Sequence, residues 1–432
     1  MELIVAAKYL VNPDAPPLES GALLCRDGKI IAVDRLPQLK RQYPQVAVRD
    51  EPDAVLLPLL VNAHTHLELT DYPRWRHEQN HANEPDSFVD WILQLISIKK
   101  GLKPSHYSVS LKNGIAQSLA AGTGVVGDIL AHYGARTAYS GTSLDGILYL
   151  ETLGQDPAVI RRVKKGLWQT LDEPFAARPA LGVSPHSPYT ISSGYLRQVY
   201  HLSRKRKLRC CTHVAESPDE VAFTTDSRGG LAERFYPAIN WQGFIPMPMK
   251  KRPVAYLHQQ GGLFPENLLV HGVQLNDEEI ELLADHGMSL VLCPRSNARL
   301  QVGKAPVAKL KRAGVKLTLG TDSLASNDSL SMWDEMAFAA TWFAGALDAP
   351  TLLRMVTRGG AEALGVAKRQ GELAPDRSAG FQLVRIPEGM ATAELYEYFV
   401  SGVGQDAIIQ VYIDGIPLRS GLMSASEQDP GA

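Results

Sequence analysis

The chain has 432 residues, of which 45% are hydrophobic and 21% charged, and this composition is typical of a globular protein with a large α/β domain and a smaller second one. Its 44 basic and 46 acidic side chains give a net charge of −2, so no strong field attracts nucleic acid or an anionic membrane. The N-terminal sequence lacks the features of a signal peptide and no apolar run reaches the roughly 18 residues of a membrane helix, which makes a cytoplasmic location the expectation.

Short β-like runs separated by turns occupy both ends of the chain. Residues 22–25 and 30–33 flank the turn at Asp27-Gly28, and similar runs return at 381–386 and 408–413. We predict a small β-sandwich domain formed from both chain ends. Its N-terminal part is residues 1–58, and its C-terminal part with a tail is residues 368–432.

Residues 59–367 alternate short apolar strands with segments of helical periodicity. The acidic start and apolar spacing of residues 277–284 predict one of these helices. Eight strands alternating with helices predict an α/β fold with a closed parallel (β/α)₈ barrel, the TIM barrel. The strands are expected at residues 57–66, 124–128, 146–151, 180–186, 208–213, 268–271, 289–293 and 316–322.

The first barrel strand ends in His64 and His66. Residues i and i+2 of a strand point the same way, so these two imidazoles can chelate a metal, although such a pair alone could equally be structural. Other predicted strands also end in metal-binding side chains, and the carboxyl ends of all barrel strands open on one face. The further candidates are His186, His213, His271 and Asp322.

Three imidazoles and one carboxylate suit Zn²⁺ or Fe²⁺, whereas Ca²⁺ and Mg²⁺ prefer more oxygen ligands. The fourth strand ends in Ser184-Pro185-His186 and offers no lysine or glutamate to bridge two ions. We therefore predict one divalent metal, with Zn²⁺ as the first choice and Fe²⁺ as the alternative. Its ligands are predicted to be His64, His66, His213 and Asp322.

Hydrolysis at such a metal needs groups that move protons. Glu216 lies three residues after His213 and can shuttle a proton, while His271 can hydrogen-bond the attacking water or the developing oxyanion. Asp322 can take the proton of the nucleophile and pass it to the leaving group. The alternatives are an exposed loop glutamate at 216 and a buried structural histidine at 271.

Six segments of the chain resemble the amidohydrolase superfamily, and within it the cytosine deaminase-like, chlorohydrolase-related branch. That branch includes S-adenosylhomocysteine/methylthioadenosine deaminases and guanine deaminases. The segments span the whole barrel. Two positions depart from the family pattern, since Leu59 stands where glycine is usual and Gly380 stands where aspartate is frequent. The resembling segments are residues 62–68, 185–189, 213–217, 270–273, 293–297 and 320–323.

The resemblance implies a mononuclear site with the four ligands named above, proton shuttling by Glu216 and water orientation by His271. It implies that His186 contacts substrate and that the protein forms a dimer or higher homo-oligomer. The implied reaction is hydrolytic deamination of an aromatic C–NH₂ group. An adenine nucleoside is the favoured substrate because residues 185–189 resemble the adenosine-type members, and the candidates are S-adenosylhomocysteine, methylthioadenosine, adenosine and aminodeoxyfutalosine.

Other functions stay open. An s-triazine or chloro-heterocycle hydrolase, or a guanine or cytosine deaminase, would keep the same metal site, and a catalytically silent metal-binding protein is the non-enzyme alternative. Residues 68–100 are expected to build the specificity pocket, with Glu84 and Trp91 as substrate contacts. Arg295 could clamp a substrate carboxylate, although a structural arginine is the stronger alternative. Residues 222–257 form either a lid or a surface excursion.

Overall fold

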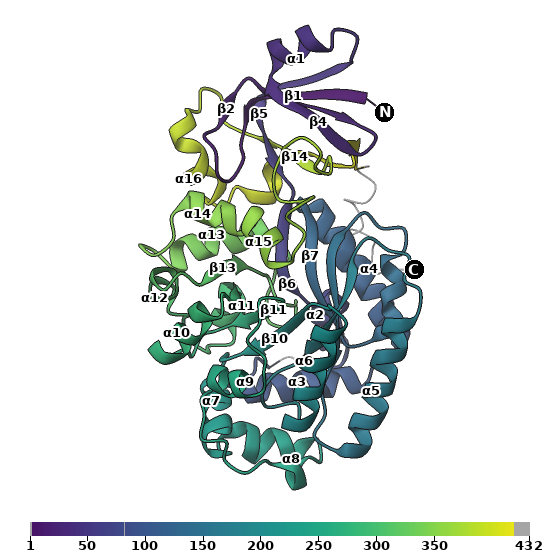
Figure 1. Ribbon diagram of the computed structural model, residues 1–432, viewed down its shortest axis with the longest axis vertical. Coiled ribbons are helices and arrows are strands. Elements are labelled where there is room, and N and C mark those ends of the chain that lie inside the picture. The colour runs from purple at the N-terminus through teal and green to yellow at the C-terminus, as the bar shows by residue number, and fades with distance from the viewer. Residues whose placement is uncertain (1, 82, 419–432) are drawn as a thin grey trace.

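The computed structural model describes residues 2–81 and 83–418 and contains two large sheets (Figure 1). One is a parallel sheet of eight strands in the order β13-β12-β11-β10-β9-β8-β7-β6, and the bridge between Thr65 and Asp322 brings its two ends together. The predicted (β/α)₈ barrel is thereby confirmed. Its strands are β6 (Leu60–Thr65), β7 (Thr123–Leu130), β8 (Asp145–Thr152), β9 (Ala180–Pro185), β10 (Cys210–Val214), β11 (Asn267–His271), β12 (Ser289–Leu292) and β13 (Lys316–Leu319).

The connections between the barrel strands carry helices, and the predicted helix at 277–284 is α10. Between β7 and β8 the structure departs from strict alternation, because only the 3₁₀ segment η2 (Tyr133–Tyr139) lies there. The helices are α2 (Tyr72–Glu78), α3 (Phe88–Lys100), α4 (Pro104–Ala120), α5 (Pro157–Asp172), α6 (Ser193–Lys205), α7 (Pro218–Asp226), α8 (Tyr236–Ala238), α9 (Pro253–Gln259), α10 (Asp277–Asp285), α11 (Pro294–Arg299), α12 (Val307–Arg312), α13 (Met332–Trp342), α14 (Ala349–Met355) and α15 (Arg358–Ala363).

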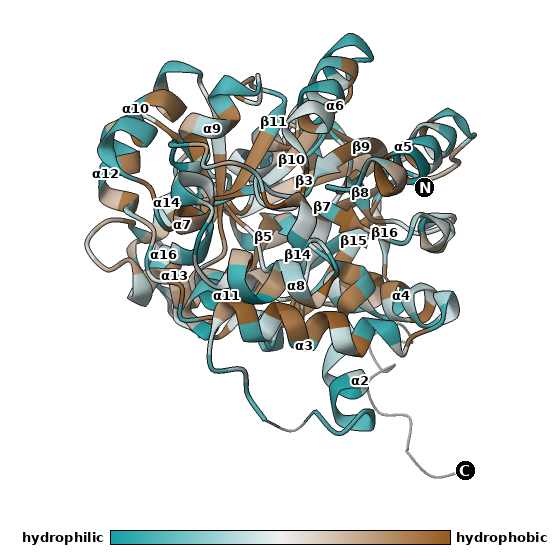
Figure 2. Ribbon diagram, turned by 90° about the horizontal axis from the view of Figure 1, so that it is seen from below, coloured by the Kyte–Doolittle hydropathy of each residue, from teal (hydrophilic) through white to brown (hydrophobic). Residues whose placement is uncertain are grey.

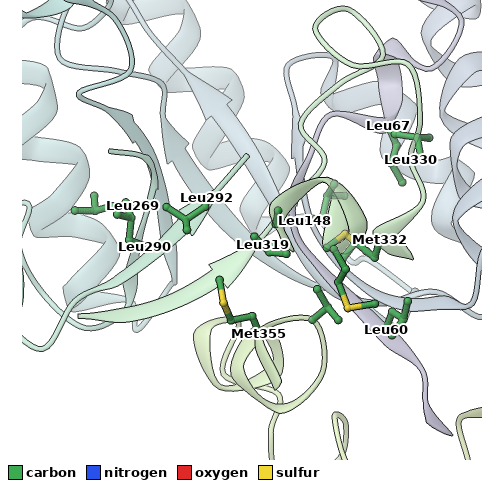
Figure 3. Close-up of a cluster of buried hydrophobic side chains, with 14 of the residues drawn as sticks. Leu60, Leu67, Leu148, Leu269, Leu290, Leu292, Leu319, Leu330, Met332 and Met355 are labelled. Atoms are coloured by element: carbon green, nitrogen blue, oxygen red, sulfur yellow. The ribbon is translucent and has the colours of Figure 1, made fainter. Parts of the chain in front are cut away.

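Alternating side chains along the barrel strands separate two layers of core. Leu268 and Val270 of β11 belong to a cluster inside the barrel, whereas Leu269 belongs to the larger cluster outside the strands. Figure 3 shows part of the outer cluster, in which Leu319 of β13 and Met355 of α14 take part. Both layers are built from buried apolar side chains, so the barrel is a packed scaffold that holds its strand ends in fixed positions.

The second sheet is mixed and comes from both ends of the chain, as predicted. The central β5 pairs in parallel with β1 and antiparallel with β14, so the N-terminal and C-terminal parts form one structure. In Figure 1 this sheet caps one end of the barrel. Its strands are β1 (Glu2–Leu10), β2 (Leu18–Glu19), β3 (Gly21–Arg26), β4 (Lys29–Arg35), β5 (Val48–Pro58), β14 (Phe381–Arg385), β15 (Ile408–Ile413) and β16 (Ile416–Pro417), with α1 (Leu36–Gln42) and α16 (Leu395–Phe399) beside them.

The opposite end of the barrel is covered by α3 and by the long connection after β10. Phe88 and Ile92 of α3 share one hydrophobic cluster with Phe223, Phe235 and neighbouring residues of that connection. Figure 2 views the molecule from this end and shows that many residues of α3 are hydrophobic. None of the helices in the described part of the chain combines the length and apolar character needed to span a bilayer. The C-terminal tail predicted at residues 424–432 lies outside the described residues.

Candidate active site

The strand-end residues predicted from the sequence converge on one cavity of about 410 Å³, within the roughly 300–1,000 Å³ usual for small-molecule sites. The cavity lies at the carboxyl ends of the barrel strands, the end where active sites of such barrels are found. His64 is fully buried beneath it. The predicted residues that line the cavity are Trp91, His66, His186, His213, Glu216, His271 and Asp322.

Local irregularities of the backbone turn the side chains of His64 and His271 toward the candidate site. Val61 and Ala63 belong to the cluster inside the barrel, so strict alternation would turn His64 away from the interior. The register of β6 against β7 shifts between Asn62 and Thr65, where β6 carries one residue more than its partner, and this bulge brings His64 to the inner side. His271 follows the inward Val270 directly and reaches the cavity because its φ is +76°.

The four predicted ligands lie at distances that fit a single zinc ion. Two atoms bound tetrahedrally to zinc at about 2.0–2.1 Å lie roughly 3.3 Å apart. Nε2 of His66 lies 3.3 Å from Nε2 of His213, and the Oδ1 atom of Asp322 lies 3.6 Å from Nε2 of His64 and 3.7 Å from Nε2 of His66. These donors therefore form a candidate metal site.

The protonation pattern of the imidazoles also fits a metal. Nδ1 of His213 donates to the carbonyl oxygen of His186 at 2.8 Å, which leaves the lone pair of Nε2 free to bind an ion. Both ring nitrogens of His64 are buried and find no hydrogen-bond partner among the described residues. A buried imidazole without a partner is costly unless another group satisfies it, and a bound metal would do so.

Asp322 is held as a carboxylate by hydroxyl groups. Its Oδ2 atom accepts hydrogen bonds from Ser296 at 2.7 Å and Ser326 at 2.9 Å, and its Oδ1 atom accepts the backbone N–H of Ser323 at 2.8 Å. Burial opposes ionisation, but the neighbouring imidazoles, first that of His64 at 3.6 Å and then that of His66 at 3.7 Å, hold the pKa of Asp322 well below its usual range. Asp322 can therefore bind a cation while its second oxygen is fixed by the serines.

Glu216 is a buried carboxyl group, not the exposed loop glutamate of the alternative interpretation. Burial, together with the nearby carboxyls of Asp322 and Glu220, raises the pKa of Glu216 well above its usual range. Its backbone N–H donates to Glu220 at 2.8 Å, which holds the turn after β10. A carboxyl group with a raised pKa beside the candidate metal site is suited to donate a proton to a substrate.

His271 faces Glu216, with 3.6 Å between its Nε2 atom and a carboxyl oxygen of Glu216. Burial is the main cause that lowers the pKa of His271 to about 3, so its imidazole is neutral at physiological pH. The side-chain amide of Asn297 donates to Nδ1 at 3.1 Å. Nδ1 is thus an acceptor, and the ring proton lies on Nε2, where it can donate to a group in the cavity.

Three further residues that are predicted to contact the substrate lie at different distances from the candidate metal site or in different cavities. His186 borders the cavity, with Nε2 3.9 Å from Glu151. Trp91 stands between this cavity and a neighbouring one, and its indole N–H donates to the carbonyl of Ala325 at 2.9 Å. Glu84 lines only the neighbouring cavity, where Arg76 lies 2.7 Å away.

Arg295 points away from the active-site cavity. Its Nε atom donates to Asn327 at 3.0 Å and its guanidinium pairs with Asp328, while its backbone N–H donates to Glu335 at 3.1 Å. These contacts place Arg295 among groups that order the loop after β13. This position agrees with the alternative interpretation, in which Arg295 has a structural role and does not bind substrate.

Sequence reasoning missed four further titratable residues that line the cavity: Glu68, Lys99, His132 and Glu151. Glu68 is buried and accepts the backbone N–H groups of Ala131 and His132. Two of the four had a usable signal: Glu68 follows His66 by two residues, and Glu151 ends a predicted strand in the same way as the histidines do. Lys99 and His132 carry no such local pattern.

The long segment at residues 222–257 contributes Phe235 to the cavity wall, and its side chains pack with α3. Phe235 belongs to the π-helical segment η3 (Leu231–Phe235). The segment therefore supplies part of the cavity wall, and its role as a lid stays a prediction.

Comparison with known proteins places the chain in a family. The model of the amidohydrolase family matches residues 55–417. The chain belongs to this family. A 5-methylthioadenosine/S-adenosylhomocysteine deaminase from Syntrophobacter fumaroxidans is 30% identical over 87% of this chain and 82% of its own length. The family and the enzyme class predicted from the sequence are confirmed.

Two other similar proteins agree with this assignment. An aminodeoxyfutalosine deaminase from Deinococcus radiodurans is 31% identical over 78% of this chain and 80% of its own length. The crystal structure of an adenosine deaminase from Xanthomonas campestris with bound zinc has a TM-score of 0.78 and 26% identity, and the match covers 96% of this chain and 92% of that one. All three of these relatives are deaminases by name.

Proposed function

We propose that this amidohydrolase is a metal-dependent deaminase that hydrolyses the exocyclic amino group of an adenine nucleoside. One observation carries the proposal: Glu216, a buried carboxyl group with a raised pKa, lines the same cavity as His66, His213 and Asp322. Together with the buried His64, these three residues lie at distances that suit one metal ion. The names of the relatives support the nucleoside class. S-adenosylhomocysteine, methylthioadenosine, adenosine and aminodeoxyfutalosine are the candidate substrates.

The site residues divide the chemistry between them. Zn²⁺, or Fe²⁺ as the alternative, would be held by His64, His66, His213 and Asp322 and would supply the Lewis acidity that activates water near neutral pH. Water adds to the amine-bearing ring carbon while Glu216 gives its proton to the adjacent ring nitrogen. The neutral His271 donates its Nε2–H to the oxygen on which negative charge develops.

Asp322 completes the reaction. Its carboxylate takes a proton from the attacking water and passes it to the amino group, which leaves as ammonia while the ring carbon becomes a carbonyl. The ring nitrogen keeps the proton from Glu216, and Glu216 regains a proton from the hydroxyl group that the water added to the ring carbon, so one water is consumed and one ammonia is released. Protonation of Asp322 is transient because Ser296 and Ser326 favour its carboxylate form.

Ammonia release by the metal-analysed protein tests this proposal. The panel contains the four adenine nucleosides with guanine, cytosine, an amino-s-triazine and a chloro-s-triazine, and chloride release is followed in parallel. We expect ammonia from an adenine nucleoside with kcat/KM above roughly 10⁴ M⁻¹s⁻¹. Chloride release without nucleoside deamination would replace the proposal with a chloro-heterocycle hydrolase.

Replacement of Glu216 tests the proton-transfer step. Glu216→Gln keeps the size of the side chain but removes the transferable proton, so we expect turnover to fall about 10²–10⁴-fold while the metal content stays unchanged. Glu281→Gln, at an exposed position of α10, is the matched control and should keep full activity. Retained activity in Glu216→Gln would remove this residue from the mechanism.

Removal of the metal tests the ligand assignment. Treatment with a chelator should abolish activity and lower the Tm, because an ion bound only by the folded state stabilises it. Adding back Zn²⁺ or Fe²⁺ to the stripped protein should restore both and show which ion supports the higher rate. The homodimer implied by the family resemblance stays a prediction that light scattering of the purified protein can test.

A further inference from the structure

One stripe of α3 forms a wall of the active-site cavity. The cavity-lining residues of this helix recur at the spacing of a single helical face. Trp91, Ile92, Leu95 and Ile96 make the first part of the stripe apolar, and the last turn of the helix ends it with two cations. Figure 2 shows α3 crossing this end of the molecule. The lining residues are Trp91, Ile92, Leu95, Ile96, Lys99 and Lys100.

The two lysines differ in their surroundings. Lys100 is exposed, as expected of a cation that complements a helix C-terminus, whereas Lys99 is half-buried. The charge of Lys99 acts on Glu68, Glu151 and His186, which lie at the ends of three different barrel strands or just beyond them. Because Lys99 also lines the cavity, its half-buried side chain lies at the mouth of the barrel.

The carboxyl groups of Glu68 and Glu151, which line the same cavity as Lys99, have other partners. Glu68 uses both oxygens to accept the N–H groups of Ala131 and His132, at 3.2 and 3.0 Å. Glu151 lies 3.9 Å from Nε2 of His186, and burial raises its pKa to about 7, so a large fraction of it is neutral. Within the part of the chain that the structure describes, no carboxylate forms an ion pair with Lys99 at 4.0 Å or less.

A half-buried ammonium group that borders a cavity without a paired anion is stabilised when a ligand supplies that anion. We propose that Lys99 selects amino-heterocyclic substrates that carry an anionic group, a carboxylate or a phosphate, in addition to the reacting amino group. The apolar stripe before Lys99 accommodates the uncharged remainder of the substrate. This inference rests on the proposed function and narrows its substrate class from adenine nucleosides in general to anionic ones.

A matched set of nucleosides tests the inference. Adenosine 5′-carboxylate and its uncharged 5′-carboxamide differ in charge but hardly in shape, and adenosine 5′-monophosphate distinguishes a phosphate from a carboxylate. We expect the wild-type protein to prefer one of the anions over the carboxamide by about tenfold or more in kcat/KM. Lys99→Met should reduce this preference to about one.

Two further variants separate charge from structure. Lys99→Arg keeps the cation and should keep the preference. Lys112→Met, at an exposed position of α4 away from the cavity, makes the same change in net charge and should also keep it. An unchanged preference in Lys99→Met, or no preference in the wild-type protein, would overturn the inference.

Binding measurements separate this inference from the proposed reaction. Calorimetric titration of the three nucleosides into Glu216→Gln, with and without Lys99→Met, reports charge selectivity without turnover. Deamination with no charge preference would overturn the role of Lys99 and leave the deaminase intact. A preference in binding that Lys99→Met abolishes, with no ammonia from any nucleoside, would support the role of Lys99 and overturn the deaminase.

Discussion

At the scale of single residues, the two departures from the family pattern explain each other. Leu59 fills space that a glycine at this position would leave open. A Cβ atom placed on Gly380 would lie 2.9 Å from Cδ1 of Leu59, and a Cβ atom on Gly124 would lie 2.3 Å from the same atom. The larger residue at 59 is therefore compatible with its surroundings only because two neighbours have no side chain.

This arrangement predicts coupling between Leu59 and Gly124. Gly124→Ala should lower the free energy of unfolding by about 1–3 kcal/mol, because the new methyl group overpacks the space against Leu59. In a Leu59→Gly background, Gly124→Ala should lower the free energy of unfolding much less. A double-mutant cycle measured by denaturant unfolding gives this comparison. Gly166→Ala, where a Cβ atom meets nothing within 4 Å, is the control and should not destabilise. Equal costs in both backgrounds would contradict the coupling.

At the scale of elements, α3 decides what the cavity accepts. The helix begins at Ser87, whose hydroxyl accepts the backbone N–H of Asp90, and it crosses the mouth of the barrel as far as Lys100. Its hydrophobic face packs on the segment that contains Phe235. The hydrogen bond from Trp91 to the carbonyl of Ala325 ties the helix to the loop after β13. Substrate binding therefore depends on how firmly α3 is held.

Trp91→Phe tests this dependence. The change removes the indole donor but keeps an aromatic ring, so we expect KM to rise about three- to tenfold, which corresponds to the roughly 1 kcal/mol of one hydrogen bond. The value of kcat should change less, because the metal ligands and Glu216 are untouched. Trp168→Phe on α5, outside the active-site cavity, should leave both constants unchanged. A fall in kcat without a change in KM would contradict a role of Trp91 in binding.

At the scale of the whole molecule, a buried carboxylate joins the barrel to the chain that returns to the mixed sheet. Asp145 begins β8 and accepts two hydrogen bonds from Arg369, at 2.8 and 2.9 Å, and one from Gln370 at 3.1 Å. Burial opposes ionisation, but the hydrogen bonds and charge of Arg369 lower the pKa of Asp145. The contact between Asp145 and Arg369 lies beside the predicted domain boundary before residue 368. This boundary and the one after residue 58 stay predictions.

Asp145→Asn tests the junction. We expect the free energy of unfolding to fall by about 1–3 kcal/mol at neutral pH. The value should lie at the lower end of this range, because Arg369 is 45% exposed and its charge is screened. A carboxyl group whose pKa is lower in the folded state than in the unfolded state stabilises the folded state at pH values above its unfolded pKa of about 3.9. This contribution is lost as the pH falls through the folded pKa. The difference between wild type and variant should therefore shrink in urea titrations below about pH 4.

The exposed pair of Asp172 and Arg206 provides the control for that experiment. Asp172 is 66% exposed, so Asp172→Asn should change stability by less than about 0.5 kcal/mol at either pH. A difference between wild type and Asp145→Asn that stays constant down to about pH 3 would show that the ionised carboxylate does not provide the stabilisation.

The sequence by itself determined the fold class and the types of residue at the site. Strand and helix periodicities are local properties, so the barrel strands could be recognised, and the histidines and Asp322 stand where those strands end. Because strand ends of a barrel share one face, their convergence followed from the fold. The structure brings these residues together, while their roles as ligands and proton carriers stay predictions.

Only the tertiary structure decided how those side chains are aimed. The bulge in β6 turns His64 inward and the positive φ of His271 brings its ring into the cavity, and neither follows from side-chain periodicity. The same holds for Lys99, which faces the cavity, and Arg295, which pairs with Asp328 outside it. These positions depend on contacts between segments far apart in the sequence, and a local pattern carries no information about such contacts.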